Sequence, residues 1–470
     1  MTDLRPTEKK FEDHIESHLN SIGYQSRHFS EYDRTLCLLR NDVVNFIRTT
    51  QPENWGRLEE IYGVDVENKV LGRVSAEIAK RGIIDVLRNP VVDRGVYLNL
   101  CYFEPKSDLN PDHQRLYESN QFIVVRQLHY SNQNENSIDT VLFLNGLPLI
   151  TMELKNQLTG QNIFHSQNQY KNDRDPKEPL LQFKRCVVHF CVDNNKVSMT
   201  TRLAGSKTFF LPFNRALENP EVKGYRTQYL WRDILTQNSV LDILENFVQV
   251  TEEKSYFFND TSQKIDTKKS ELLIFPRYHQ LDLIRSLRNQ LKRDGAGKNY
   301  LVQHTTGSGK SYSIGWLAHT LTSLYKSEGD KTRLFDTIIV VTDRTVLDDQ
   351  LRNTIRSLAN VDGVVNGVQK GSKELKEFLE LGKDIVITTI QKFPFISETI
   401  ASLGHRTFGV IIDEVHSSQS GELSKELKRS LSNTDDEDDD AVDYEEMLRR
   451  EIASRGKQNH ISFFGFTGTP

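Results

Sequence analysis

Two segments of the sequence combine residue types that suit phosphate chemistry. The first, His304 to Ser311, reads HTTGSGKS and places two glycines before a lysine and a serine. Backbone N–H groups of such a loop can surround phosphates, Lys310 would reach the β- and γ-phosphates, and the Ser311 hydroxyl would bind Mg²⁺. An apolar run precedes the loop and a helical pattern follows it, which favours a nucleotide-binding loop over a plain turn. The residues predicted to hold nucleotide are Thr306, Gly307, Ser308, Gly309, Lys310 and Ser311.

Two carboxylates stand further along the chain, after a run typical of a buried parallel strand. Asp413 and Glu414 directly follow the apolar residues 410–412. Ligands of open α/β sheets bind at the carboxyl ends of the strands. Asp413 is therefore a candidate Mg²⁺ ligand, and Glu414 is a candidate base that activates the attacking water. The pair alone is a weak signal, and the phosphate loop upstream strengthens it.

The second segment, residues 138–155, sets two acidic residues and a lysine on a predicted hairpin. Glu153 and Lys155 are two apart and share one face of a strand, while Asp139 lies on the preceding strand. In a chain with 27% charged residues, a solvated strand face explains most such triplets. Apolar neighbours imply burial, however, and a buried carboxylate is costly unless it is paired or binds a metal. We therefore predict that Asp139 and Glu153 hold Mg²⁺ and that Lys155 positions or activates the attacking water.

The turn Asn145-Gly146 decides whether these side chains can meet. In a strict two-residue hairpin, Asp139 would pair with Met152, so that Asp139 and Glu153 would point to opposite faces of the sheet. One extra residue restores the match. We predict a three-residue loop with Gly146 left-handed, or a β-bulge beside it, with the two carboxylates within roughly 5 Å of each other.

Composition limits the class of protein. The 470 residues are 37% hydrophobic, with a formal net charge of -5, as in a packed globular chain of two or three domains. No apolar run approaches ~18 residues, and the N-terminal residues MTDLRPTEKK carry charges, so neither a membrane span nor a secretory signal is predicted. The 4 cysteines form no CxxC pair, which disfavours disulfides and structural zinc. We expect a cytoplasmic protein that does not contact a membrane.

Periodicity divides the chain into two regions. A helical pattern at 10–22 and strand-like runs between residues 96 and 203 predict an α+β domain, and after residue 276 buried strands alternate with helices, as in a doubly wound parallel sheet. Further helices are expected at 35–48, 75–88, 161–175 and 241–250. The fold class is therefore α/β, with domains at 1–258 and 272–470 joined by a linker at 259–271. The acidic run DDEDDD at 435–440 is expected to be a solvated loop.

The second region resembles the motor of superfamily 2 helicases, a RecA-like domain. The segments that carry the resemblance are PRYHQ (276–280), TTGSGKS (305–311), VVTDRTVLDDQL (340–351), TTIQKF (388–393), DEVH (413–416) and FTGTP (466–470). The resemblance implies that ATP is bound, with Arg277 and Gln280 at the adenine. It also implies that four residues couple hydrolysis to DNA: His416, Thr467, Gly468 and Thr469. Such motors need a second RecA-like domain with an arginine finger, so we expect this chain to be an N-terminal fragment of a longer polypeptide.

The hairpin at 138–155 resembles the core of PD-(D/E)xK nucleases. Ile138 stands where the signature has proline, a departure that many members share. The resemblance implies that Glu12, on the first predicted helix, supplements the site, although an ordinary exposed glutamate is the alternative. It also implies a Q-x-x-x-Y motif on the next helix. Tyr170 matches that motif, but Ser166 stands in place of the glutamine, with Gln167 and Gln169 nearby.

A nuclease core placed before such a motor resembles the R subunit of type I restriction–modification enzymes. Residues 144–157, LNGLPLITMELKNQ, are similar to the usual sequence of that family in this segment. The resemblance implies an ATP- and Mg²⁺-dependent translocase and endonuclease that acts on double-stranded DNA. Its partners would be the methyltransferase and specificity subunits. A type III restriction subunit or a repair helicase–nuclease is the alternative enzyme. A nuclease fold that binds DNA without cutting it is the alternative outside enzymes.

Overall fold

The computed structural model describes the chain as two compact units, residues 1–279 and 280–470. The described residues are 8–105, 111–259, 264–305, 307–326, 332–342, 345–358, 363–368, 371–389, 400, 403–413 and 460–468. Within them, no helix has the length and apolar character needed to cross a membrane. Each unit is described by itself.

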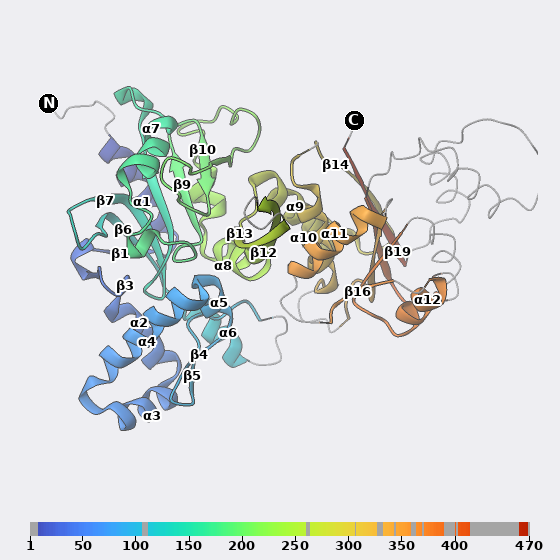
Figure 1. Cartoon of the computed structure of the whole chain (residues 1–470), viewed down its shortest axis with the longest axis horizontal. Helices are drawn as coiled ribbons and strands as arrows, with labels where there is room; N and C mark the ends of the chain where they lie inside the picture. Colours follow the sequence, from blue (N-terminus) through green and yellow to red (C-terminus); the bar gives the residue numbers. More distant parts are fainter. Residues whose placement is uncertain are drawn as a thin grey trace, which may run out of the picture. The chain divides into compact units, whose positions relative to one another are not determined.

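The first unit is built on a seven-stranded mixed sheet with the order β1-β6-β7-β8-β9-β10-β11 (Figure 1). The strands are β1 (Gln25–Arg27), β6 (Phe122–His129), β7 (Ser137–Leu144), β8 (Leu147–Leu154), β9 (Val188–Val192), β10 (Val197–Thr200) and β11 (Leu211–Pro212). β6, β7 and β8 form an antiparallel meander, and β9 then runs parallel to β8 after a crossover that contains α7 (Ile163–Asn168). This α+β sheet confirms the fold class expected for the first region.

Helix α1 (Glu8–Ser21) precedes the sheet, as the pattern at 10–22 predicts. Phe11, Ile15 and Leu19 recur at helical spacing and are buried. Glu12 lies on the same side of the helix and is also buried. A carboxylate among these apolar residues needs partners, and the sheet provides them.

A group of helices and two small hairpins extends the first unit (Figure 1). The helices are α2 (Arg40–Thr50), α3 (Pro52–Tyr62), α4 (Val66–Arg81), α5 (Ile83–Arg88), α6 (Pro111–Glu118) and α8 (Gln237–Asn246). The hairpins are β2 (Tyr32–Asp33) with β3 (Leu38–Leu39), and β4 (Val91–Asp93) with β5 (Val96–Leu98). The helix expected at 75–88 is interrupted at Gly82, whose φ of 89° ends α4.

The hairpin of β7 and β8 contains the predicted irregularity. Asn145 and Gly146 form a two-residue turn with φ values of 53° and 81°, and Leu144 pairs with Leu147. The register then shifts by one, so that Leu142 pairs with Ile150 and Thr140 with Met152. Leu149 is the extra residue of a β-bulge. The bulge alternative is therefore confirmed, although it lies beyond Pro148 rather than directly beside Gly146.

The stretch 259–271 differs from the expected linker. β12 (Gln249–Asn259) and β13 (Lys264–Ile274) form a two-stranded antiparallel hairpin, which includes most of this stretch. The Ser/Thr- and charge-rich composition suggested a linker because it lacks the apolar alternation of a half-buried strand. A two-stranded ribbon outside the main sheet does not require that alternation.

The second unit contains a six-stranded, wholly parallel sheet with the order β14-β19-β18-β15-β17-β16. Its strands are β14 (Asn299–Gln303), β15 (Thr337–Thr342), β16 (Val365–Gly367), β17 (Ile385–Thr389), β18 (Phe408–Ile412) and β19 (Ile461–Thr467). Its helices include α9 (Tyr278–Asp294), α10 (Lys310–Thr322), α11 (Thr345–Ser357) and α12 (Ser372–Glu380). β14, β19 and β18 are neighbours, so the segments after their carboxyl ends lie at one edge of the sheet. This RecA-like arrangement confirms the doubly wound parallel sheet.

The turn before β8 yields a stability prediction. A Cβ atom on Gly146 would lie 2.7 Å from both the Leu39 carbonyl oxygen and Val43 Cγ2. We expect Gly146→Ala to lower the free energy of unfolding by roughly 3 kcal/mol or more, since it adds overpacking to left-handed strain. Gly95 is the matched control, because its φ is 79° and an added Cβ there would meet no atom within 4 Å. Gly95→Ala should cost about 1–2 kcal/mol. If urea unfolding shows that both variants lose the same free energy of unfolding, the close packing at Gly146 is contradicted.

Candidate functional site

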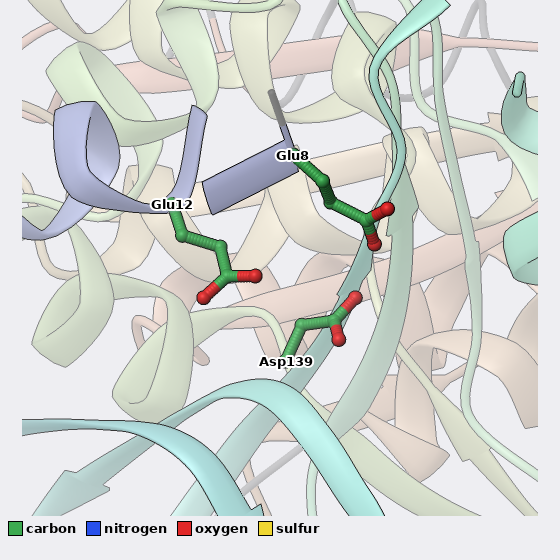
Figure 2. A group of neighbouring side chains, drawn as sticks. All are labelled: Glu8, Glu12 and Asp139. Carbon is green, nitrogen blue, oxygen red and sulfur yellow. The ribbon is translucent and has the colours of Figure 1, made fainter. Parts of the chain in front are cut away.

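Three carboxylates meet where α1 crosses the sheet. One oxygen each of Glu8, Glu12 and Asp139 lies within 4.8 Å of the other two, and Figure 2 shows the side chains turned toward one another. Glu12 and Asp139 are 5% and 6% exposed. Glu8 was not predicted, although it stands one helical turn before Glu12 and therefore on the same face of α1.

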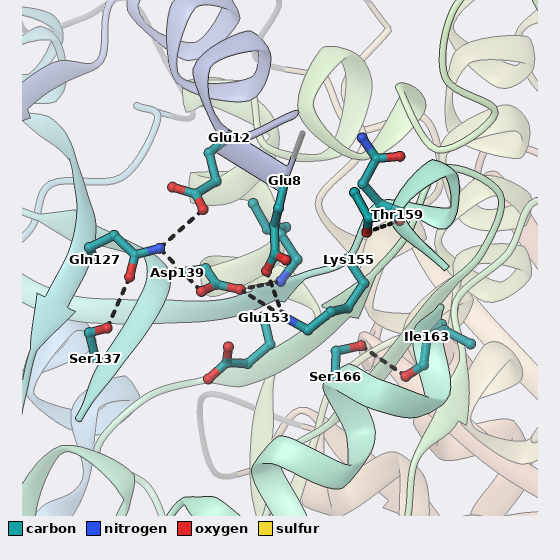
Figure 3. A network of polar contacts seen from close by, with 12 residues as sticks. Glu8, Glu12, Gln127, Ser137, Asp139, Glu153, Lys155, Thr159, Ile163 and Ser166 are labelled. Carbon is teal, nitrogen blue, oxygen red and sulfur yellow. Dashed lines mark hydrogen bonds and ion pairs between the residues drawn. The ribbon is translucent and has the colours of Figure 1, made fainter. Parts of the chain in front are cut away.

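Lys155 lies beside this acidic group. Its Nζ atom is 2.6 Å from Glu8 Oε1 and 3.7 Å from Asp139 Oδ2. The backbone N–H of Leu154 donates to Asp139 Oδ2 at 2.7 Å, which fixes that carboxylate against β8. Burial lowers the pKa of Lys155, but the charges of Asp139 and Glu8 outweigh this effect and raise it. The lysine is therefore a cation held next to Asp139, and Figure 3 shows it pointing toward the two acids.

Glu153 is fully buried, with an exposed fraction of 0%. Its Oε1 accepts a hydrogen bond of 2.7 Å from Nε of Arg174, a residue that the sequence did not single out. Its Oε2 is buried and has no hydrogen-bond partner among the described residues. Burial and the negative charge of Asp139 raise the pKa of Glu153 well above its usual range, against the opposing effect of Arg174. Glu153 thus adjoins Asp139 but is not part of the group that meets within 4.8 Å.

These residues fit a divalent cation. Carboxylate oxygens are the ligands that Mg²⁺ and Ca²⁺ prefer. The unpartnered Oε2 of buried Glu153 is a costly feature unless another group contacts it. Burial, reinforced by the charge of Asp139 and opposed by Arg126, also raises the pKa of Glu12. A cation at this place would reduce the repulsion among the carboxylates.

Tyr170 belongs to a buried network behind the site. Its hydroxyl is 2.6 Å from Thr151 Oγ1, which is 2.7 Å from His189 Nδ1. Thr151 shares a face of β8 with Glu153, so this network supports the strand that carries the carboxylate. Burial lowers the pKa of His189 to about 3, so its ring is neutral at pH 7.

The residues near the expected Q-x-x-x-Y glutamine contact other groups. Ser166 Oγ donates to the Ile163 carbonyl at 2.8 Å, and Gln167 Nε2 donates to Ser198 Oγ at 2.9 Å. Gln169 Oε1 is buried without a hydrogen-bond partner in the described part of the chain. Tyr170 is therefore the member of this motif whose contacts lead toward the strand of Glu153.

The phosphate loop of the second unit connects β14 to α10. Gly307 and Gly309 have φ values of 75° and 85°, and α10 begins at Lys310, so the loop turns as the pattern predicts. Lys310 Nζ lies 3.0 Å from Asp413 Oδ1. Gln280 Nε2 donates to the carbonyl oxygens of Ser308 and Gly309 at 3.2 and 3.1 Å. The lysine and the aspartate that were predicted from separate motifs are thus in contact.

Neighbouring strands bring further predicted residues to this edge. The backbone N–H of His304 donates to the Thr467 carbonyl at 2.7 Å, so the segment with Thr467 and Gly468 adjoins the start of the loop. Ser311 follows Lys310 in the first turn of α10. Arg277 is half-buried and belongs to the first unit. Thr306, Glu414, His416, Thr469 and the acidic run at 435–440 lie outside the described residues.

The fold and these two sites define a protein that combines a nuclease-like α+β unit with a RecA-like unit carrying a phosphate loop. The family models agree with this class. Residues 84–208 match the type I restriction enzyme R protein N terminus, and residues 279–436 match the SWI2/SNF2 ATPase. The first region of the chain is thus similar to the N terminus of type I restriction enzyme R proteins, and the second region is similar to a SWI2/SNF2 ATPase.

The curated relatives that match the chain are endonuclease subunits of type I restriction enzymes. The type I restriction enzyme HindI endonuclease subunit of Haemophilus influenzae is 27% identical over 75% of this chain and 31% of its own length. A type I endonuclease subunit of Staphylococcus aureus is 25% identical over 75% of this chain and 32% of its own. The match thus spans about a third of these relatives. The helicase domain of Hef from Pyrococcus furiosus aligns with 41% of this chain and 34% of that one, at 18% identity and a TM-score of 0.24.

The buried histidine gives a pH prediction. The pKa of His189 is lowered from 6.5 to about 3 in the folded chain, so the unfolded state binds more protons between these values. The stability that a neutral His189 contributes is present above pH 6.5 and is lost as the pH falls. We expect acidification from pH 6.5 to 5 to cost up to about 2 kcal/mol at this residue. His189→Gln should reduce the pH dependence of urea unfolding, whereas exposed His113→Gln should not. An unchanged pH dependence in His189→Gln would contradict a neutral, buried ring.

Proposed function

We propose that this chain provides the nuclease and the first motor domain of a type I restriction endonuclease subunit, and that it cuts duplex DNA in a reaction that depends on ATP and Mg²⁺. The observation that carries the proposal is the meeting of Asp139, Lys155 and buried Glu153 on one hairpin. This hairpin lies within the part of the chain that matches the R protein N terminus.

In the proposed nuclease reaction, Asp139 and Glu153 would hold Mg²⁺. Glu12 and Glu8 would be the other carboxylates of the site. A bound magnesium ion would polarise the scissile phosphate and stabilise the charge that develops on it. Lys155 would orient the attacking water and offset the negative charge of the phosphate, because its ammonium group already lies beside Asp139. Release of Lys155 from Glu8 when DNA binds would free that ammonium group for the phosphate.

In the proposed motor, the loop from Thr306 to Ser311 would bind the triphosphate of ATP. Lys310 would move from Asp413 to the phosphates, which are the stronger anionic partner. Asp413 would then hold the magnesium of the nucleotide together with Ser311, and Glu414 would orient the attacking water. Arg277 and Gln280 would contact the adenine, while His416, Thr467, Gly468 and Thr469 would couple hydrolysis to DNA movement.

The proposed partners follow from the same family. Methyltransferase and specificity subunits would recruit this subunit and recognise the DNA sequence. The motor would translocate duplex DNA, and the nuclease would cut it away from the recognition site.

Two lysine substitutions should separate the two chemistries. Lys155→Met should abolish DNA cleavage while most ATP hydrolysis remains, because it removes a charge from the nuclease unit only. Lys310→Ala should abolish ATP binding and therefore translocation, since it removes a charge-assisted donor to the phosphates. DNA cleavage and ATP hydrolysis by both variants are measured in the complete complex with ATP, Mg²⁺ and duplex DNA. ATP binding is measured with a fluorescent ATP analogue.

The matched control is Lys196→Met, which breaks an ion pair of 2.9 Å with Glu218 whose side chains are 43% and 61% exposed. This variant should keep both activities. Normal cleavage by Lys155→Met would refute the nuclease assignment, and normal ATP binding by Lys310→Ala would refute the motor assignment.

A further inference from the structure

Gln127 has a backbone conformation that strands rarely use. Its φ is 46°, in the left-handed region, although it lies within β6. A side chain is crowded by its own backbone there, which is why glycine and asparagine dominate this region. Arg126 pairs with Thr140 and Leu128 with Ile138, while the ladder skips Gln127 and the residue opposite it, Asp139. The irregular residue therefore lies directly across from a predicted metal ligand.

The side chain of Gln127 connects two of the clustered carboxylates. Its Nε2 donates to Glu12 Oε1 at 3.0 Å and to Asp139 Oδ1 at 3.3 Å (Figure 3). Its Oε1 accepts a hydrogen bond of 2.9 Å from Ser137 Oγ. Because an amide oxygen only accepts, this bond fixes the amide with its NH₂ group toward the acids. One donor group thus links helix α1 to strand β7 at the site.

We propose that Gln127 is a positioning residue that holds Glu12 and Asp139 in place for a shared divalent cation. With this left-handed backbone, the amide of Gln127 lies within hydrogen-bond distance of both acids. The inference rests on the proposed nuclease function. Strain at an unusual backbone position persists only when surrounding contacts impose it, and such positions cluster at functional sites.

Two substitutions separate strain from positioning. Gln127→Gly removes the amide and also relieves the left-handed strain, so the free energy of unfolding should stay equal or rise, while the Mn²⁺ dissociation constant should increase roughly 10-fold or more. Gln127→Met keeps the side-chain length and the strain but removes both donations, so Mn²⁺ binding should weaken by a similar factor. Binding to the 470-residue chain is followed by electron paramagnetic resonance of free Mn²⁺, and stability by urea unfolding without metal.

Arg94→Gly is the matched control, because exposed Arg94 has a φ of 48° in the turn between β4 and β5. It should relieve the same strain and leave Mn²⁺ affinity unchanged. If both Gln127 variants bind Mn²⁺ as the wild type does, while Asp139→Asn does not, Gln127 has only a structural role and the inference is wrong. If Asp139→Asn also binds Mn²⁺ normally, the proposed nuclease site itself fails.

Discussion

A shift of one residue in the hairpin of β7 and β8 is the constraint on which the nuclease site depends. Side chains alternate between the two faces of a sheet, so a regular hairpin would turn Asp139 away from Glu153 and Lys155. Leu149 is the extra residue, and Pro148 before it has no N–H to donate to the ladder. The turn itself is buried, because Gly146 packs against Leu39 and Val43. The same few residues of the turn and the bulge therefore set both the position of the turn and the orientation of the acids.

Once the acids share a face, their charges must be balanced. Arg126 donates to Glu12 at 3.0 Å and lies 3.1 Å from Glu16, Arg174 donates to Glu153, and Lys155 contacts Glu8. Each acid thus has a basic partner from another element, which limits the cost of burying it. Arg174 leaves Oε2 of Glu153 without a hydrogen-bond partner among the described residues. A divalent cation would provide a partner for this oxygen.

The sequence predicts much of this arrangement because the signals are local. The alternation of β7 and β8, the bulge, the glycines of the phosphate loop and the parallel strands all follow from spacing within short segments. Gln127 and Arg174 could not be predicted, because their roles depend on which distant segments pack beside them. The ribbon of β12 and β13 was mistaken for a linker, since it lacks an apolar face pattern. Helix α3 was not predicted either, although Pro52 at its start and Gly63 after its end are helix signals.

The most direct test of the shared site is the anomalous scattering of Mn²⁺ in crystals of the chain. The site described above predicts a peak at about 2.0–2.6 Å from carboxylate oxygens of both Asp139 and Glu153. A peak that contacts Glu8 and Glu12 but neither Asp139 nor Glu153 would contradict the account, and so would the absence of any peak in the first unit at saturating Mn²⁺.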